Sequence, residues 1–185
     1  MIPDSALLDP ASEVFYDLET QLSADDVGGW QNSHLMRVAL AVTWCARHGV
    51  RRWDESSVKE LIEYLTSFAR IVSFNGDNFD SRVLSFYGDV RILRSKSFDV
   101  LVDLTVRLGH RVSLDALASA TLGRKKTADG LAAIRWWKAG RLEELAAYCE
   151  NDVGVLRDIV AYGRHSGHVR YLDRSGVTRS VSVEW

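Results

Sequence analysis

The sequence is poor in cysteine, in proline and in net charge, and it has no long apolar run. Only two cysteines occur, Cys45 and Cys149, and both fall within apolar stretches, which suits buried thiols in a reducing compartment better than a disulfide framework. No run of roughly 18 apolar residues is present, and the N-terminal segment lacks a basic region. We therefore predict a cytoplasmic protein that is not exported and has no membrane partner.

The balance of charge is nearly even. The 23 Lys and Arg residues and 25 Asp and Glu residues give a formal net charge of -2, so any binding of nucleic acid must be local or metal-assisted. The five histidines have no spacing that indicates a metal site or a triad, and no serine or cysteine stands in a nucleophile motif. The hydrophobic content of 46% over 185 residues allows one core. We predict a single domain with at most a small appendage, and no small-molecule organic cofactor.

Hydrophobic periodicity predicts an α/β fold. Runs of β-branched and aromatic residues predict strands over residues 12–20, 36–47, 49–54 and 70–76. Helical spacing with capping residues predicts helices over residues 54–70, 77–88, 97–109, 113–123, 128–140 and 140–165. Because the first three strands form a meander, the sheet should be mixed. Alternating residues around "DRSG" predict a C-terminal hairpin, which either extends the sheet or contacts a partner.

Acidic residues stand at three places where this fold would bring them together. Asp17 and Glu19 are two apart at the end of the first strand, so their carboxylates share one face. Asp80 lies one turn into the helix after the fourth strand, while Tyr148 and Asp152 lie one turn apart on the last helix. Converging carboxylates repel one another and need a cation, and ligands that are all oxygen select Mg²⁺ or Mn²⁺.

The same residues carry a resemblance to a known family. "DLE" at 17–19, "NGDNFD" at 75–80 and "YCEND" at 148–152 resemble the three motifs of the DEDD 3′-5′ exonucleases, which have the ribonuclease-H-like fold of DnaQ-type proofreading enzymes. Tyr148 resembles the tyrosine branch of that superfamily, because the histidine branch would place a histidine where Ala147 stands. The C-terminal half is similar to helicase-linked bacterial exonuclease domains and to the proofreading domain of family-B DNA polymerases.

The resemblance implies a fold and a domain division. The fold class would be α/β, with a ribonuclease-H-like mixed five-stranded sheet flanked by helices and a C-terminal β-hairpin appendage. The exonuclease domain would span residues 1–167 and the hairpin extension residues 168–185.

The resemblance also implies roles for individual residues. Asp17, Glu19, Asp80 and Asp152 would bind two Mg²⁺ or Mn²⁺ ions, and Tyr148 would orient the attacking water. A phenol with an ordinary pKa near 10 is a poor base at neutral pH, which favours positioning over proton abstraction. The residues expected to bind the substrate are Leu18, Thr20, Asn75, Phe79, Arg124, Lys125 and Lys126.

The predicted function is a metal-dependent exonuclease that releases nucleoside 5′-monophosphates from the 3′ ends of single-stranded DNA or RNA. Two alternatives stay open: a ribonuclease-H-type endonuclease, and a catalytically idle module that binds nucleic acid or a helicase. Any processivity would come from an oligomer or from a partner, such as a helicase or polymerase acting in trans. Trp30, in the loop after the first strand, either stacks on a base or folds back onto its own domain.

Overall fold

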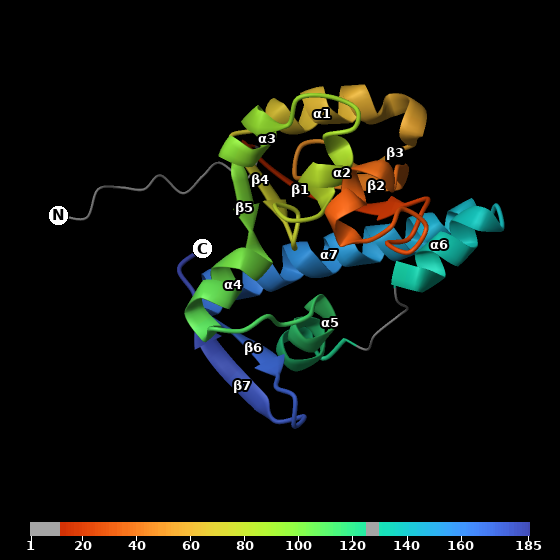
Figure 1. Ribbon diagram of the computed structural model, residues 1–185. Helices are drawn as coiled ribbons and strands as arrows, with labels where there is room; N and C mark the ends of the chain where they lie inside the picture. The colour runs from red at the N-terminus through yellow and green to blue at the C-terminus, as the bar shows by residue number, and fades with distance from the viewer. Residues whose placement is uncertain (1–11, 125–129) are drawn as a thin grey trace.

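A five-stranded mixed sheet forms the centre of the protein (Figure 1). In the computed structural model, which describes residues 12–124 and 130–185, the strand order is β3-β2-β1-β4-β5. The strands are β1 (Glu13–Thr20), β2 (Val38–Cys45), β3 (Gly49–Trp53), β4 (Arg70–Ser73) and β5 (Ser97–Asp99). β2 is antiparallel to both β1 and β3, whereas β4 is parallel to both β1 and β5. The predicted mixed five-stranded sheet is confirmed.

Helices cover both faces of the sheet. They are η2 (Trp30–Leu35), η3 (Glu55–Ser57), α1 (Val58–Thr66), α2 (Asp80–Leu84), α3 (Arg91–Ser95), α4 (Val100–Leu108), α5 (Leu114–Leu117), η4 (Ala118–Leu122), α6 (Gly130–Lys138) and α7 (Leu142–Ser166). Figure 1 shows α1 and α3 on one side of the sheet and α7 running along the other. Over residues 12–124 and 130–185, none of these helices is long and apolar enough to cross a membrane.

The alternation of side chains along β1 divides the core into two parts. Val14, Tyr16 and Leu18 are buried against α1, α2 and α3. Phe15 points the other way and is buried with the apolar side chains of α7. Because side chains two apart share a face of a strand, Asp17 and Glu19 lie on the α7 side with Phe15. The strand thus positions both carboxylates at the boundary between the sheet and α7.

The prediction that residues 97–109 form one helix was wrong at its start. Ser97–Asp99 is the edge strand β5, which pairs with β4, and α4 begins only at Val100. The Asp99 carboxylate causes this break, because its Oδ1 accepts hydrogen bonds from the backbone N–H groups of Leu101 (2.9 Å) and Val102 (3.2 Å). The short helices η2 and α3 lie in segments for which no regular structure was predicted.

The C-terminal hairpin was predicted correctly and does not extend the central sheet. Its strands, β6 (His168–Leu172) and β7 (Thr178–Ser182), form a two-stranded sheet of their own. Val169 and Tyr171 are nevertheless buried in the same cluster as the apolar side chains of α7. The indole N–H of Trp185 donates to Asp103 of α4 at 2.7 Å, so the end of the chain is fixed to the domain.

Candidate metal centre

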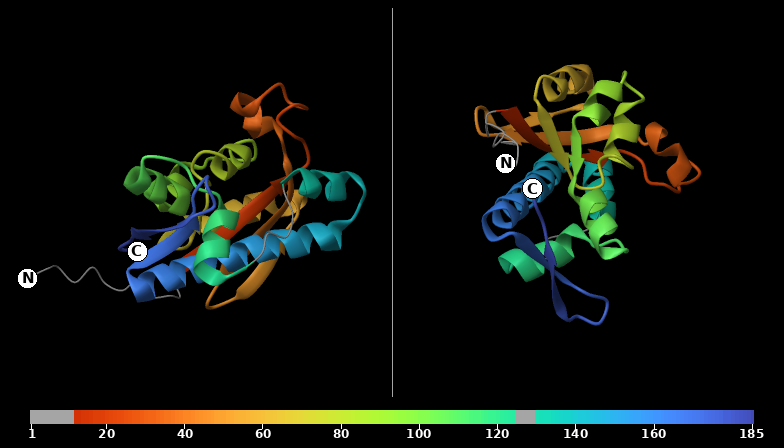
Figure 2. Two further views of the ribbon diagram at one scale, coloured as in Figure 1. Left: turned by 90° about the horizontal axis from the view of Figure 1, so that it is seen from below. Right: turned by 90° about the vertical axis from the view of Figure 1, so that its left-hand side faces the viewer.

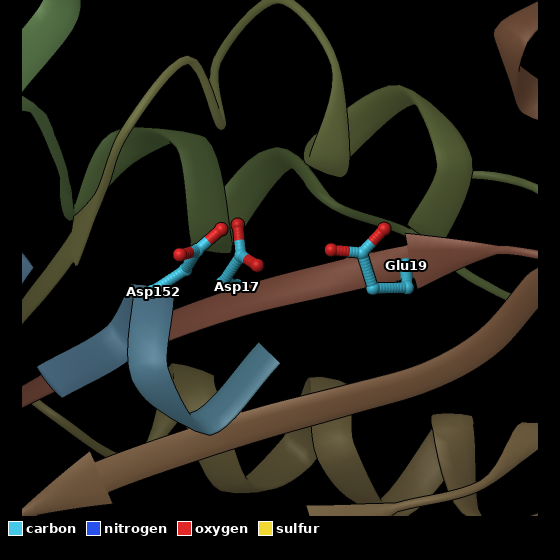
Figure 3. A group of neighbouring side chains, drawn as sticks. All are labelled: Asp17, Glu19 and Asp152. Atoms are coloured by element: carbon cyan, nitrogen blue, oxygen red, sulfur yellow. The ribbon is translucent and has the colours of Figure 1, made fainter. Parts of the chain in front are cut away.

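Three carboxylates from the first strand and the last helix meet on the α7 side of the sheet. Asp17 and Glu19 project from β1 and Asp152 from α7, and one oxygen of each lies within 4.8 Å of the other two (Figure 3). Figure 3 shows the carboxylates of Asp17 and Asp152 next to each other, with Glu19 farther along the strand. The structure therefore brings together three of the four acids that the sequence singled out, although they are up to 135 residues apart in the chain.

Burial and mutual repulsion make this cluster electrostatically unfavourable by itself. Burial is the main cause that raises the pKa of Asp17 well above its usual range, followed by the charges of Asp80, Glu19 and Asp152. Burial likewise raises the pKa of Glu19, with further contributions from Asp152 and Asp80. The Cys149 thiol, 3.5 Å from Asp17 Oδ2, partly opposes the shift at Asp17 by hydrogen bonding. A bound cation would relieve both the repulsion and the cost of burial.

Asp80, at the first position of α2, lies next to the cluster but outside the group of three. Its side chain is only 3% exposed, and within the described residues its Oδ1 has no hydrogen-bond partner. Burial raises the pKa of Asp80 to about 7; the charge of Asp99 adds to this, while the backbone amides of Asp80 and Leu18 oppose it. A buried carboxylate oxygen without a partner is costly, and it indicates that a ligand belongs there.

Asp99 holds the loop that carries Asp80, and the sequence analysis missed this residue. Its carboxylate accepts hydrogen bonds from the backbone N–H groups of Asn75 (2.8 Å) and Asp77 (3.0 Å) as well as from the first turn of α4. Asn75 has a left-handed backbone with φ of 72°, so the chain turns sharply just after β4. The only local signal for Asp99 was its suitability as a helix N-cap, which carries no information about the loop.

Gly76 allows this loop to pack against β4 and β1. A Cβ atom there would lie 2.3 Å from Ser73 Oγ, 2.6 Å from Ser73 Cβ and 3.0 Å from the Tyr16 hydroxyl. These contacts are too short to be relieved by a side-chain rotation alone, because Ser73 Cβ is fixed by the strand.

We predict that Gly76→Ala lowers the free energy of unfolding by about 1–3 kcal/mol, because the overpacked loop must move away from β4. Chemical denaturation measures the change. Gly154→Ala is the matched control: a Cβ there meets nothing within 4 Å, and alanine should stabilise α7 by up to about 1 kcal/mol. Equal effects of the two substitutions would contradict the packing described for Gly76.

Tyr148 lies on α7, one turn before Asp152, and is partly buried. Its ring is 5.8 Å from that of Trp136 on α6. Burial, followed by the charges of Asp152, Glu19 and Asp17, raises the pKa of Tyr148 far above its ordinary value, and a hydrogen bond to Asp152 acts in the same direction. The phenol therefore stays protonated at neutral pH and serves as a hydrogen-bond donor.

The predicted substrate-binding residues near β1 and α2 fall into two groups. The Leu18 side chain is buried against α1, and the Thr20 hydroxyl donates to the backbone oxygen of Leu22 at 2.9 Å. Thr20, Asn75 and Phe79 line a cavity of about 570 Å³, together with Glu19. These three residues can therefore contact a ligand in the cavity, whereas the buried Leu18 has only its backbone to offer.

The predicted basic loop is described only in part. Arg124 forms an ion pair with Asp158 of α7 and lines a smaller cavity of about 200 Å³ that also contains Asn151 and Asp152. Lys125 and Lys126 lie outside the described residues. The guanidinium of Arg124 is thus held by a carboxylate one and a half turns from Asp152, a contact that the sequence analysis did not anticipate.

The strand order, the helices on both faces and the acids shared by the first strand and the last helix define a ribonuclease-H-like domain. The sequence profile of the RNase H superfamily matches residues 14–165, and the chain belongs to that superfamily. The predicted relationship is therefore confirmed at this level. No curated protein matches the sequence of this chain.

Two of the solved structures that share the fold are compared with this chain. One is a family B DNA polymerase from the hyperthermophilic archaeon Pyrobaculum calidifontis, with a TM-score of 0.61 and 15% identity over 83% of this chain. The other is RNase D from Trypanosoma brucei, with a TM-score of 0.59 and 16% identity over 82% of this chain. The aligned region spans 24% of the polymerase chain and 57% of the RNase D chain. At 15% and 16% sequence identity, the similarity to these two structures is evidence of a shared fold alone.

Proposed function

We propose that this protein is a metal-dependent 3′-5′ exonuclease that hydrolyses phosphodiester bonds at single-stranded ends and releases nucleoside 5′-monophosphates. The observation that carries the proposal is the acid cluster of Asp17, Glu19 and Asp152, beside an Asp80 carboxylate oxygen that has no hydrogen-bond partner among residues 12–124 and 130–185. Membership of the RNase H superfamily supports a nuclease. The fold shared with an RNase D and with a family B DNA polymerase supports an exonuclease rather than another nuclease of that superfamily.

The donor set fits hard divalent cations. All four side chains offer carboxylate oxygens, which are the ligands that Mg²⁺ and Mn²⁺ prefer. A bound cation would also offset the repulsion between the carboxylates and so stabilise the protein. Asp17, Glu19 and Asp152 would hold one ion, and Asp80, beside Asp17, would contribute to holding a second. When bound, two such ions lower the pKa of a water and stabilise the leaving oxygen.

The protein's own groups position the reactants. The Tyr148 hydroxyl, which donates its one proton to Asp152, would accept a hydrogen bond from the attacking water and so turn the water's lone pair toward phosphorus. Asp152 Oδ1 accepts a 3.2 Å hydrogen bond from the Asn151 side chain, which restricts the rotation of its carboxylate. The loop held by Asp99 fixes the start of α2 and with it Asp80. Placement of these groups before the substrate arrives would make the site efficient.

A linear and a circular single strand of the same sequence test the proposal. We expect hydrolysis of the linear strand with Mg²⁺ or Mn²⁺, mononucleotides carrying a 5′ phosphate as the first products, and an intact circle. Degradation of the circle would show an endonuclease instead. Tight binding of both strands without cleavage at any metal concentration would favour an idle nucleic-acid-binding module.

A further inference from the structure

The cavity beside Glu19 lies between two walls that come from distant parts of the chain. Residues of the β1–β2 connection, including Leu22 and Trp30, form one wall, while Leu131 and Ile134 of α6 form the other. Figure 2 shows, in its left view, that η2 and α6 both lie beyond the end of β1. A volume of about 570 Å³ is within the range of roughly 300–1,000 Å³ that holds one small ligand.

Both walls expose large apolar side chains to this space. Trp30 is 68% exposed, and its ring lies edge-on to Phe79 with 5.9 Å between centroids. Leu131, on the α6 wall, is 61% exposed. An exposed indole in edge contact with a second aromatic ring offers a flat surface on which a planar base can stack, and such stacking needs no particular base sequence.

Each wall is anchored separately to the domain. On the first wall, the guanidinium of Arg82 in α2 donates to the backbone oxygen of Gln31 at 2.9 Å. On the second, Ala133 of α6 is fully buried with Leu145 of α7 and Ala39 of β2. The two walls are thus held by different elements, and any contact that crosses the gap adds to what fixes the distance between them.

An ion pair crosses that gap. Lys138 Nζ, one turn beyond Ile134 on α6, lies 3.2 Å from Asp26 Oδ2. The same Asp26 oxygen accepts hydrogen bonds from the backbone N–H (2.9 Å) and the hydroxyl (2.8 Å) of Ser23, so Asp26 is already fixed. Lys138 is the longer and freer member of the pair, and its side chain is 53% exposed. Separation of the two walls must break this contact.

We propose that the cavity admits one unpaired terminal nucleotide whose base stacks on Trp30, and that the Asp26–Lys138 ion pair holds the walls at a spacing that rejects a base-paired end. The proposal rests on the proposed function and adds the residues that select the substrate. A base-paired end brings a second nucleotide and its backbone, which the closed walls do not accommodate. Entry of that end therefore costs the energy of the ion pair.

Binding measurements test this selection without requiring cleavage. Oligonucleotides labelled at the 5′ end, with either an unpaired or a blunt paired 3′ end, are titrated by fluorescence anisotropy with Ca²⁺ as the cation. The wild-type protein should bind the unpaired end more tightly. Trp30→Ala should weaken binding of that end about five- to 150-fold, the cost of one lost base stack, whereas Trp30→Phe should retain most of the affinity.

The ion pair is tested by the ratio of the two dissociation constants. Lys138→Ala should lower the preference for the unpaired end about two- to fivefold, as expected for an exposed ion pair, and Lys138→Arg should keep it. Lys59→Ala, on the exposed face of α1, loses the same charge away from the cavity and should leave the ratio unchanged.

The outcomes separate this inference from the proposed function. Equal binding of both ends by the wild-type protein would overturn the inference, as would a ratio of dissociation constants in Lys138→Ala that equals the wild-type ratio. An unchanged ratio in Lys59→Ala together with a lower ratio in Lys138→Ala would support the inference even if no metal gave cleavage. In that case the exonuclease proposal alone would fail.

Discussion

Asp17→Asn should abolish hydrolysis and at the same time stabilise the metal-free protein. Loss of one carboxylate from the cluster removes a ligand for a cation that contributes several kcal/mol in the transition state, so activity should fall by about a thousandfold or more. The same substitution removes the negative charge that Glu19 and Asp152 face, which relieves repulsion on the order of 1–4 kcal/mol. A gain in stability together with a loss of activity is the result expected where a functional site holds like charges close together.

The two effects are measured on one preparation. Initial rates on a single-stranded oligonucleotide give the activity, and urea denaturation in chelator gives the free energy of unfolding. Glu60→Gln removes one negative charge from the exposed surface of α1 and should change neither quantity appreciably. Full activity of Asp17→Asn would rule out the assigned centre. Equal stabilisation by Glu60→Gln would show that net charge, and not the cluster, governs stability.

The metal-free protein should become more stable as the pH falls from 7 to 4, and a divalent cation should remove this dependence. The pKa of Asp80 is raised from 3.8 to about 7, so between these values the folded protein binds more protons than the unfolded chain. Stability then decreases as the pH rises through this window and reaches its low plateau above pH 7. For a group that is 3% exposed, the full change is on the order of a few kcal/mol.

Thermal unfolding between pH 4 and 7, with and without Mg²⁺, measures this dependence. The surface acids Asp26 and Asp89 do not change stability between pH 4 and 7. Their pKa values are lowered to about 2, so their stabilising contribution is lost only below pH 4. Asp80→Asn removes one titrating group and should reduce the slope of the metal-free profile, while Asp17 and Glu19, whose pKa values are also raised, keep its direction. A wild-type stability that rises with pH over this range would contradict the assignment of Asp80.

Local patterns were sufficient to predict where the acids project. The period of two along β1 placed Asp17 and Glu19 on one face, and the helical period of α7 placed Tyr148 one turn from Asp152. Both are properties of a single element, so they do not depend on how the elements pack. The order of the motifs along the chain supplied the remaining information, because consecutive strands tend to be neighbours in the sheet.

What the sequence analysis missed depends on contacts between distant segments. β5 is only three residues long and is followed directly by a strong helix pattern, so its pairing with β4 left no local signal. The role of Asp99 arises because the end of β5 lies beside the loop after β4. The cavity requires α6 to lie opposite Trp30, which is about 100 residues earlier in the chain. The spacing of residues within one helix or strand does not indicate which distant segments pack against it.

The most direct test of the central claim is a time course of cleavage on single-stranded DNA and RNA of one sequence, labelled at the 5′ end. Reactions contain Mn²⁺, Mg²⁺ or chelator. We predict a ladder that shortens one nucleotide at a time from the 3′ end with either cation and no cleavage in chelator. Cleavage that persists in chelator, or internal cuts that appear before the end shortens, would contradict a metal-dependent 3′-5′ exonuclease built on Asp17, Glu19 and Asp152.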